Sequence, residues 1–297
     1  MKQILLAINF NFNYYQQIPV LKKFYEPHFG KVVFCGYDKS SNYSEDELLK
    51  MTGTKGYEGY QCLALAIEKY PNYKGYFHSN DDVLLNFWNL NFDIDRVWLG
   101  APAHLTYVRG KRPFPKWVWW PTSGPRCERV FQKLNSMVAE ETKFTEFTVS
   151  NAPDTRLPIQ RNELKKLLQV YYKNSGMKKL CMKGWSDAFY VPKKHSTVYS
   201  KLSQIFEEEK VYLEAASTII LHMLDDTKDM VQMNGMYHVD KKHGFKKKTF
   251  SFYRTYSFNL TFSHPFKMSS HHAKKFFELA VIPHAEKMVA KCNGETF

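Results

Sequence analysis

The residues best suited to chemistry in this sequence are Asn80, Asp81 and Asp82, which directly follow the aromatic segment KGYFHS. Two adjacent carboxylates at the end of a buried strand are unfavourable unless a positive group neutralises them. Mg²⁺ and Mn²⁺ bind oxygen ligands, usually one or two carboxylates together with phosphate oxygens and water. The carboxylates could instead cap a following helix, whose exposed N–H groups and dipole favour negative charge. These three residues alone leave both interpretations open.

Two further carboxylates, Asp187 and Glu214, lie in apolar surroundings in the second half of the chain. The segment 178–194, KKLCMKGWSDAFYVPKK, predicts a strand with Asp187 in its middle. The segment 211–224, VYLEAASTIILHML, predicts an apolar helix that carries Glu214 near its start. Glu214 is either a partner of the helix dipole or a catalytic base in a desolvated pocket. Asp187 either binds an acceptor hydroxyl or satisfies neighbouring backbone groups.

A histidine and a lysine follow a third segment with strand-like alternation. The run YSFNLTF, residues 256–262, predicts a strand, and His264 and Lys267 come just after it. An imidazole and an ammonium group suit a metal-bound diphosphate, although a single histidine at a strand end is often structural. Upstream, Trp117 and Trp119 alternate as in a strand and share one face, which indicates either core packing or a stacking platform for a sugar ring.

The elements expected before Asp82 alternate between strands and helices. Strands are predicted over 2–10, 31–36 and 74–79, and helices over 14–25, from Ser44 onward and over 60–70. This order predicts an α/β fold with a mostly parallel central sheet, whose ligands bind beyond the carboxyl ends of the strands. Several polar residues fall at such ends, which favours a binding site over a helix cap: Asn9, Asn11, Tyr37, Asp38, Asn80, Asp81 and Asp82.

The nucleotide-binding motifs that depend on glycine are absent from the sequence. No Gly-x-Gly-x-x-Gly follows the first strand, and no Gly-x-x-x-x-Gly-Lys-Ser/Thr occurs anywhere. A Rossmann dehydrogenase and a P-loop enzyme are therefore disfavoured. A metal ion that bridges a diphosphate to the carboxylates could replace the glycine-rich loop.

Composition sets broader limits. The 297 residues, 44% of them hydrophobic, suffice for one large α/β domain or two small ones. No apolar run reaches the ~20 residues of a membrane span, and the initial ILLAI is too short for a signal peptide. Five scattered cysteines without a Cys-x-x-Cys pair indicate neither a zinc site nor a disulfide framework and favour a reducing compartment. We therefore expect a cytoplasmic protein, or the soluble catalytic domain of a Golgi-type enzyme whose anchor has been removed.

Taken together, these segments resemble the nucleotide-sugar glycosyltransferases of the GT-A fold. NDDV at 80–83 is similar to the DDDV of that family, with Asn80 in place of the first acid. GWSDAFYVP at 184–192 and LEAASTIIL at 213–221 are similar to segments of exostosin-like and STELLO-like transferases, and SHPFK at 263–267 resembles their C-terminal histidine motif. The start of the chain, INFNFNYYQQIPVLKKFYEPHFGKVVFCG, also resembles these proteins. The compact length and the many Lys, Tyr and Phe residues are also similar to those of glycosyltransferases from large algal viruses, including xylosyltransferases.

The resemblance implies a role for each candidate residue within one GT-A domain, 1–297. Residues 1–125 would form the nucleotide-sugar-binding half, and residues 126–297 the acceptor-binding and catalytic half. The implied cofactor is Mn²⁺ or Mg²⁺, and the implied donor is a UDP-sugar. The expected metal ligands are Asp82, Asn80 and His264. The donor would be bound by Asn9, Asn11, Tyr37, Asp38, Asn80, Asp81 and Lys267. The catalytic residues would be Glu214 and Asp187, and the acceptor-binding residues Trp117, Trp119 and Trp185.

The expected activity is metal-dependent transfer of a sugar, with xylose as one candidate, to a glycan hydroxyl with inversion. One alternative is a nucleotidyltransferase acting on sugar phosphates, which would need a glycine-rich basic loop after the first strand, where this chain has INFNFNYY. A second alternative is a nucleic-acid-binding protein, suggested by the net charge of +13. No helix-turn-helix, zinc-finger or RRM signature supports that alternative, and we expect no specific nucleic-acid partner.

Overall fold

The computed structural model describes most of the chain in ten segments. They are residues 1–37, 43–44, 46–52, 57–91, 93–100, 105–108, 120–139, 159–176, 179–237 and 256–292. Three of the predicted site residues, Asp38, Trp117 and Trp119, lie outside these segments.

A seven-stranded mixed sheet forms the centre of the molecule, with the strand order β10-β6-β9-β4-β1-β2-β3. The strands are β1 (Ile4–Asn9), β2 (Lys31–Gly36), β3 (Leu48–Lys50), β4 (Gly75–Asn80), β6 (Trp98–Leu99), β9 (Ala188–Pro192) and β10 (Val231–Gln232). Neighbouring strands are parallel except at β9, which is antiparallel to both β4 and β6. The predicted α/β fold with a mostly parallel sheet is therefore confirmed, and it is consistent with a GT-A-like architecture.

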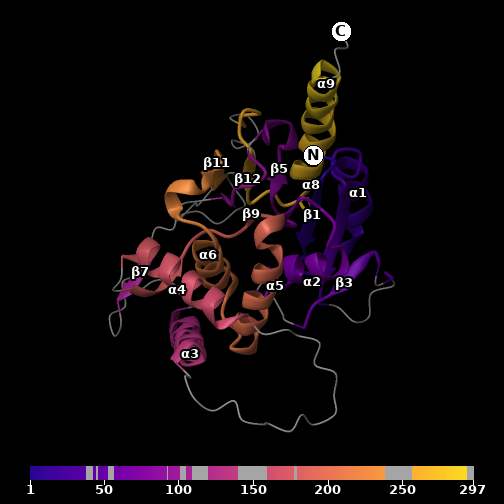
Figure 1. Ribbon diagram of the computed structural model, residues 1–297. Coiled ribbons are helices and arrows are strands. Elements are labelled where there is room, and N and C mark those ends of the chain that lie inside the picture. Colours follow the sequence, from indigo (N-terminus) through magenta and orange to yellow (C-terminus); the bar gives the residue numbers. More distant parts are fainter. Residues whose placement is uncertain are drawn as a thin grey trace.

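Helices pack on both faces of this sheet (Figure 1). Leu5 and Ala7 of β1 face one core, which contains residues of α2 (Tyr60–Lys69), α5 (Lys193–Glu208) and α6 (Leu213–Leu224). Ile4, Leu6 and Ile8 face the other core. That core contains residues of α1 (Ile18–Tyr25), α8 (His271–Phe276) and the π-helical segment Phe277–Val281. Strands with both faces covered read as continuous apolar runs, which is why ILLAIN and KVVFCG were recognisable from sequence.

The longer remaining helices also contribute residues to these cores, α3 (Trp120–Ala139) and α4 (Arg161–Ser175) to the first and α9 (Ile282–Cys292) to the second. Helices α3 and α4 pack beside α6 and β8 (Lys179–Lys183). Helix α9 continues from the π-helical segment and extends away from the sheet (Figure 1). Short 3-10 helices cover Tyr15–Gln17, Phe87–Asn89 and Thr227–Asp229. Among the described residues, no helix combines the length and the apolar character that a membrane crossing requires.

Two small sheets complete the fold, and one of them positions the candidate site. Strands β11 (Gly235–Tyr237), β12 (Phe262–His264) and β5 (Leu84–Leu85) form a three-stranded sheet. Strand β5 begins two residues after Asp82 and pairs with β12, and the amide of Phe266 donates to the carbonyl of Asp82 at 2.5 Å. The end of β12 is therefore held beside the end of β4. The other small sheet pairs β7 (Leu105–Val108) with β8.

The structure corrects two of the predicted elements. No helix starts at Ser44; its amide and hydroxyl bind the Glu47 carboxylate in a tight turn, and Leu48 begins the edge strand β3. The predicted strand over 256–262 is also wrong, because strand structure begins only at Phe262. In that segment the carbonyls of Phe258 and Leu260 accept hydrogen bonds from the side-chain amide of Asn89, which replace strand pairing.

The segment around Asp187 differs from its prediction as well. It forms two strands, β8 and β9, with Asp187 in the connection rather than inside a strand. The amide of Gly184 donates to the carbonyl of Glu214 at 3.1 Å, and a Cβ at Gly184 would lie 2.8 Å from the Thr218 hydroxyl. Strand β8 therefore ends where Gly184 meets α6.

Four of the five cysteines form disulfides, which corrects the expectation of unpaired thiols. Cys35 of β2 is bonded to Cys62 of α2, with sulfurs 2.09 Å apart. Cys127 of α3 is bonded to Cys181 of β8, with sulfurs 1.97 Å apart. Sequence separations of 27 and 54 residues hide both pairs from any local spacing rule.

Candidate functional site

A chain of buried amide side chains links the ends of β1 and β4 to Asp187. Asn9 and Asn80 are opposite each other in the β1–β4 register, so both strand ends reach the same edge of the sheet. The Asn9 Nδ2 donates to Asn80 Oδ1 at 3.0 Å and to Asn11 Oδ1 at 2.9 Å. The Asn80 Nδ2 in turn donates to Asp187 Oδ1 at 2.8 Å. Asn80 therefore orients Asp187, and its own oxygen accepts from Asn9.

Asp82, Asp187 and His264 converge beyond this edge from three separate elements. One potential ligand atom of each lies within 4.8 Å of the other two. The His264 Nε2 is 3.3 Å from Asp82 Oδ1 and 3.3 Å from Asp187 Oδ1. Two carboxylates and one imidazole form a donor set that suits Mn²⁺, and Mg²⁺ accepts the carboxylates. The residues present therefore fit a divalent ion.

The charges of this cluster are mutually dependent. Burial lowers the pKa of His264, but the negative charges of Asp187 and Asp82 outweigh it and raise that pKa to about 9. Burial raises the pKa of Asp82, but the hydrogen bond and charge of His264 and the charge of Lys267 bring it below its usual value. Without an ion, the protonated imidazole thus supplies the positive charge between the carboxylates. A metal ion needs the neutral imidazole, so its binding releases a proton.

Asp81 and Lys267 lie next to the cluster of Asp82, Asp187 and His264. Asp81 is buried and accepts a hydrogen bond from the amide of Asn11 at 3.3 Å. Burial, followed by the charge of Asp82, raises the pKa of Asp81 to about 7. The Lys267 Nζ is 3.8 Å from Asp82 Oδ2. A small cavity is lined by Asn11, Phe12, Tyr14, Gln17, Asp81, Asp82, Lys267, Met268 and Ser269.

Tyr37 and Asn11 belong to the same edge. The Tyr37 hydroxyl donates to the carbonyl of Asn11 at 3.1 Å. The predicted donor-binding residues that the structure describes, from Asn9 to Lys267, are therefore connected by hydrogen bonds or short charge contacts around the carboxyl ends of β1, β2 and β4.

Glu214 lies on the first turn of α6, where its carboxylate meets a lysine. The Lys183 Nζ is 3.1 Å from Glu214 Oε2, and it also lies over the Trp185 ring at 5.7 Å from the ring centre. Lys183 is at the end of β8, so the short connection to β9 carries Lys183, Trp185 and Asp187 in sequence. This connection joins Glu214 to the metal-ligand cluster.

An aromatic pair contacts both groups, Trp185 through Lys183 and Tyr237 through His264. The rings of Trp185 and Tyr237 stack with centroids 5.0 Å apart and an angle of 27° between planes. The Tyr237 ring is also 5.7 Å from the His264 ring, since both residues are partners in the β11–β12 register. Sequence reasoning missed Tyr237, because a strand of only three residues such as β11 produces no recognisable alternation of polar and apolar residues. It missed Lys183, because a single lysine outside any known motif does not stand out in the sequence.

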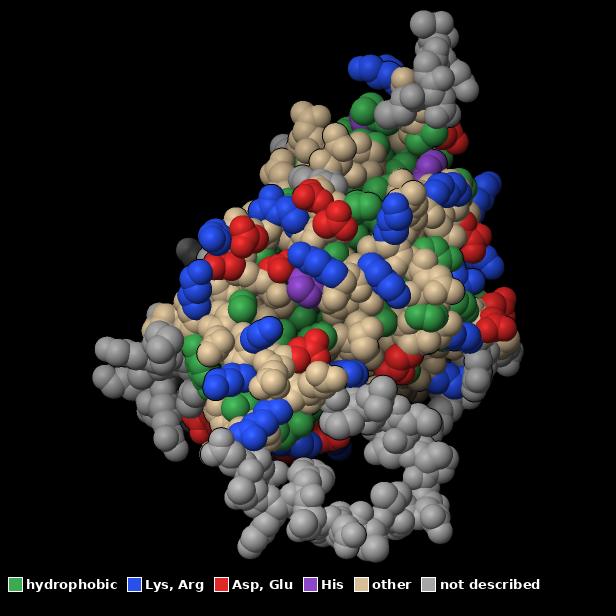
Figure 2. Space-filling view, viewed as in Figure 1, with side chains coloured by type: hydrophobic (Ala, Val, Ile, Leu, Met, Phe, Trp, Pro, Cys, Tyr) green, Lys and Arg blue, Asp and Glu red, His purple; other side chains and the backbone are tan. Residues whose placement is uncertain are grey.

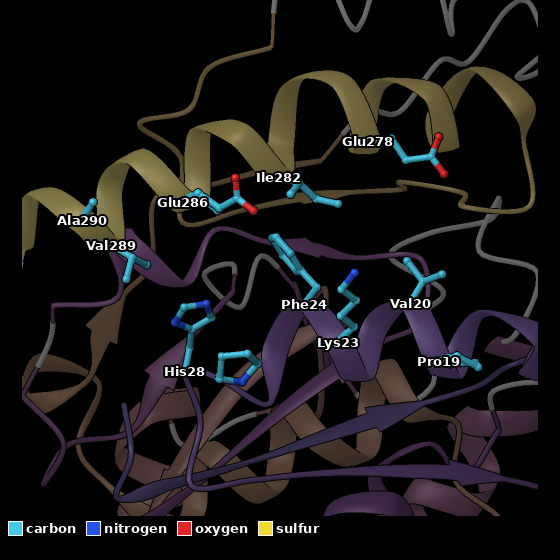
Figure 3. A pocket seen from close by; sticks show the side chains of 12 residues that line it. Pro19, Val20, Lys23, Phe24, His28, Glu278, Ile282, Glu286, Val289 and Ala290 are labelled. Carbon is cyan, nitrogen blue, oxygen red and sulfur yellow. The ribbon is translucent and has the colours of Figure 1, made fainter. Parts of the chain in front are cut away.

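A larger hollow lies elsewhere, between α1 and α9 (Figure 3). Its volume is about 750 Å³, and Phe24 of α1 points across it toward α9. Its walls are mostly apolar, with Lys23, Glu278 and Glu286 at the rim. None of the predicted site residues lines this hollow, so the larger volume of this cavity does not mark the candidate site.

Residues 1–145 match the family described as STELLO glycosyltransferases. No curated protein matches the chain. The matched region contains the amide chain and both carboxylates after β4, whereas Asp187, Glu214 and His264 lie beyond it. The match confirms the STELLO-like resemblance over these residues, and it indicates a glycosyltransferase enzyme. The similar segments at 184–192, 213–221 and 263–267 lie outside the match.

Proposed function

Because residues 1–145 match the STELLO glycosyltransferases, we propose that the chain transfers a sugar from a UDP-sugar to a glycan hydroxyl with the help of a divalent ion. The observation that carries this proposal is the convergence of Asp82, Asp187 and His264 within 4.8 Å, next to an edge of the sheet that suits a nucleotide. A UDP-sugar presents a diphosphate, which shares an ion with carboxylates readily. The proposed ligands are Asp82, Asp187 and His264, and Asn80 orients Asp187 instead of binding the ion itself.

The residues around the cluster divide the chemical work. A bound divalent ion would stabilise the negative charge that develops on the departing diphosphate. Lys267 adds a positive charge at the same place, 3.8 Å from Asp82. Glu214 accepts the proton of the acceptor hydroxyl, whose oxygen forms a bond to the anomeric carbon. The bond from that carbon to the diphosphate oxygen breaks, and its electron pair leaves with UDP. Attack from the face opposite to UDP inverts the anomeric carbon.

The position of Glu214 supports its role as the base. Its carboxylate is only partly exposed and is held by Lys183 at 3.1 Å, and Lys183 lies over the ring of Trp185, which stacks on Tyr237. A sugar ring must fit between a metal-held diphosphate and the acceptor hydroxyl. Aromatic faces suit the C–H surfaces of such a ring. Trp185 therefore remains our proposed acceptor-binding residue, together with Trp117 and Trp119.

The arrangement of the sheet supports one domain with two functional halves. Strand β9 comes from the second half of the chain, yet it is inserted between β4 and β6 of the first half. Residues 1–125 supply the proposed donor side, and residues 126–297 supply Glu214, Asp187 and His264. Separation of these halves would expose the edge of β4, so we propose a single domain over 1–297.

The surface gives less support to a nucleic-acid-binding function. On the face shown in Figure 2, Lys and Arg side chains are interspersed with Asp and Glu side chains. Nucleic-acid-binding domains usually concentrate basic residues in a patch or stripe. The net charge of +13 is instead compatible with attraction of anionic nucleotide sugars.

A screen of UDP-sugars tests the proposed function and identifies the donor. We expect the protein to hydrolyse one UDP-sugar slowly in Mn²⁺, with UDP-xylose as a first candidate. The same UDP-sugar should raise the melting temperature of the protein. The reaction should stop when EDTA removes the ion. Equal hydrolysis in EDTA would contradict metal-dependent transfer.

The two disulfides lead us to propose a secretory compartment instead of the cytoplasm. Disulfides persist in oxidising compartments and are rare in the cytosol. They join β2 to α2 and α3 to β8, so both fix a strand near the site to a neighbouring helix.

Loss of one disulfide is expected to destabilise the fold. Removing the Cys127–Cys181 bond with the double substitution Cys127→Ser and Cys181→Ser should lower the free energy of unfolding by about 2–4 kcal/mol, because the 54-residue loop gains entropy when unfolded. Chemical denaturation with and without dithiothreitol measures this effect. The double variant should respond less to dithiothreitol than the wild type. Equal stability of wild type in both conditions would show that the disulfides do not form.

A further inference from the structure

The hydroxyl of Tyr237 is buried without a hydrogen-bond partner among the described residues. A buried polar group in this condition is explained by a water, an ion, a ligand or a functional role. Two described tyrosine hydroxyls have this property, those of Tyr60 and Tyr237. Tyr60 is the first residue of α2, near Tyr199 and Glu207 of α5. Tyr237 lies instead at the candidate site.

The surroundings of Tyr237 indicate what its partner is. Its ring stacks on Trp185 at 5.0 Å and lies 5.7 Å from the ring of His264. The charges of Asp187 and Glu214 act on its hydroxyl, so both carboxylates lie in its neighbourhood. A phenolic hydroxyl is a hydrogen-bond donor at neutral pH and can donate to a ligand.

Space beside the hydroxyl is limited on one side by the backbone. A Cβ at Gly100 would lie 2.9 Å from the Tyr237 hydroxyl and 2.4 Å from the carbonyl of Ala188. The glycine thus lets the tyrosine approach the end of β6 closely. A rigid aromatic ring with one protonated hydroxyl is suited to position a polyhydroxylated ring.

We propose that Tyr237 is a substrate-positioning residue that contacts the transferred sugar. Its ring, backed by Trp185, forms a wall of the sugar subsite between the metal-ligand cluster and Glu214, and its hydroxyl donates a hydrogen bond to a sugar oxygen. This inference rests on the proposed function, because a diphosphate on the cluster and an acceptor on Glu214 leave the transferred sugar beside Tyr237. The ligand class is a pyranose ring linked to a nucleoside diphosphate.

The substitution Tyr237→Phe keeps the stacked ring and removes only the hydroxyl. We expect its melting temperature to equal or exceed that of the wild type, because an unpaired buried hydroxyl has been removed. Its affinity for UDP in Mn²⁺ should be unchanged. Its affinity for the UDP-sugar that the wild type hydrolyses should fall about threefold to tenfold, the range expected for loss of one neutral hydrogen bond. The ratio of the two affinities isolates the sugar contact.

Tyr60→Phe is the matched control, since it also removes a buried hydroxyl without a hydrogen-bond partner. It should leave both affinities unchanged. An unaltered affinity ratio and unaltered hydrolysis in Tyr237→Phe, with a wild type that binds UDP in Mn²⁺, would overturn the role of Tyr237 alone. A wild type that binds neither UDP nor UDP-sugars would overturn the proposed function and this inference together.

Discussion

Replacing Asp82 by alanine is expected to lower metal-dependent sugar transfer by about a hundredfold to a thousandfold, the effect of losing a principal electrostatic group at a reacting centre. Asp82 contacts His264 at 3.3 Å and Lys267 at 3.8 Å, so it is the carboxylate to which both positive side chains are directed. Its removal takes away one proposed ion ligand. Turnover of the UDP-sugar over a range of Mn²⁺ concentrations measures the loss.

The matched control for this substitution is Asp95→Ala, because Asp95 is an exposed aspartate away from the cluster. Asp95→Ala should keep wild-type turnover and Mn²⁺ dependence. If Asp82 were only capping a turn after β4, Asp82→Ala would lower the melting temperature but keep metal-dependent turnover. That outcome would remove Asp82 from the proposed ion site.

Replacing Glu214 by glutamine is expected to lower turnover by about a hundredfold to ten-thousandfold, as for loss of a general base. Glutamine is close in size to glutamate, so the first turn of α6 should keep its structure. The side chain at position 214 should also stay next to Lys183, which lies over the Trp185 ring. Binding of UDP-sugar should change little, because Glu214 is placed on the acceptor side. Steady-state kinetics and donor titration on the same protein separate the two effects.

Glu163→Gln provides a matched control, since Glu163 is the acidic residue in the first turn of α4. A carboxylate that only interacts with the helix dipole contributes about 0.3–1 kcal/mol to stability. If Glu214 had only that role, Glu214→Gln and Glu163→Gln would both retain turnover and show similar small losses of stability. Retained turnover in Glu214→Gln would require another base.

The part of the fold that sequence predicted well consists of strands buried on both faces. ILLAIN, KVVFCG and GYFHSN have continuous apolar or aromatic character, and their order with the helices between them indicates a parallel sheet. The carboxyl ends of such strands meet at one edge, which is why Asn9 and Asn80 could be expected to be neighbours.

Short and irregular elements were not predictable in the same way. Ser44 closes a turn with Glu47, and this pattern is the same that starts a helix, so the local sequence does not separate the two outcomes. Asp187 leaves the strand because Gly184 contacts α6, a contact between residues about 30 positions apart in sequence. Its place beside Asp82 and His264 therefore depends on tertiary packing.

The candidate site was predicted from sequence as a set of residues without a geometry. Sequence reasoning selected Asp82, Asp187 and His264, but it assigned Asp187 to the acceptor and Asn80 to the ion. The structure brings Asp187 into the cluster and turns the Asn80 amide toward it. The roles of both residues stay predictions until an ion is observed. Tyr237 had no signal in the sequence, because its significance comes from stacking on Trp185.

A calorimetric titration of the wild type with UDP in Mn²⁺ at physiological salt tests the central claim most directly. We predict saturable binding of one UDP per chain, loss of that binding in EDTA, and no comparable binding of a single-stranded oligonucleotide of similar charge. UDP binding that is equally strong in EDTA would contradict an ion held by Asp82, Asp187 and His264. Tight oligonucleotide binding without UDP binding would contradict the transferase site as a whole.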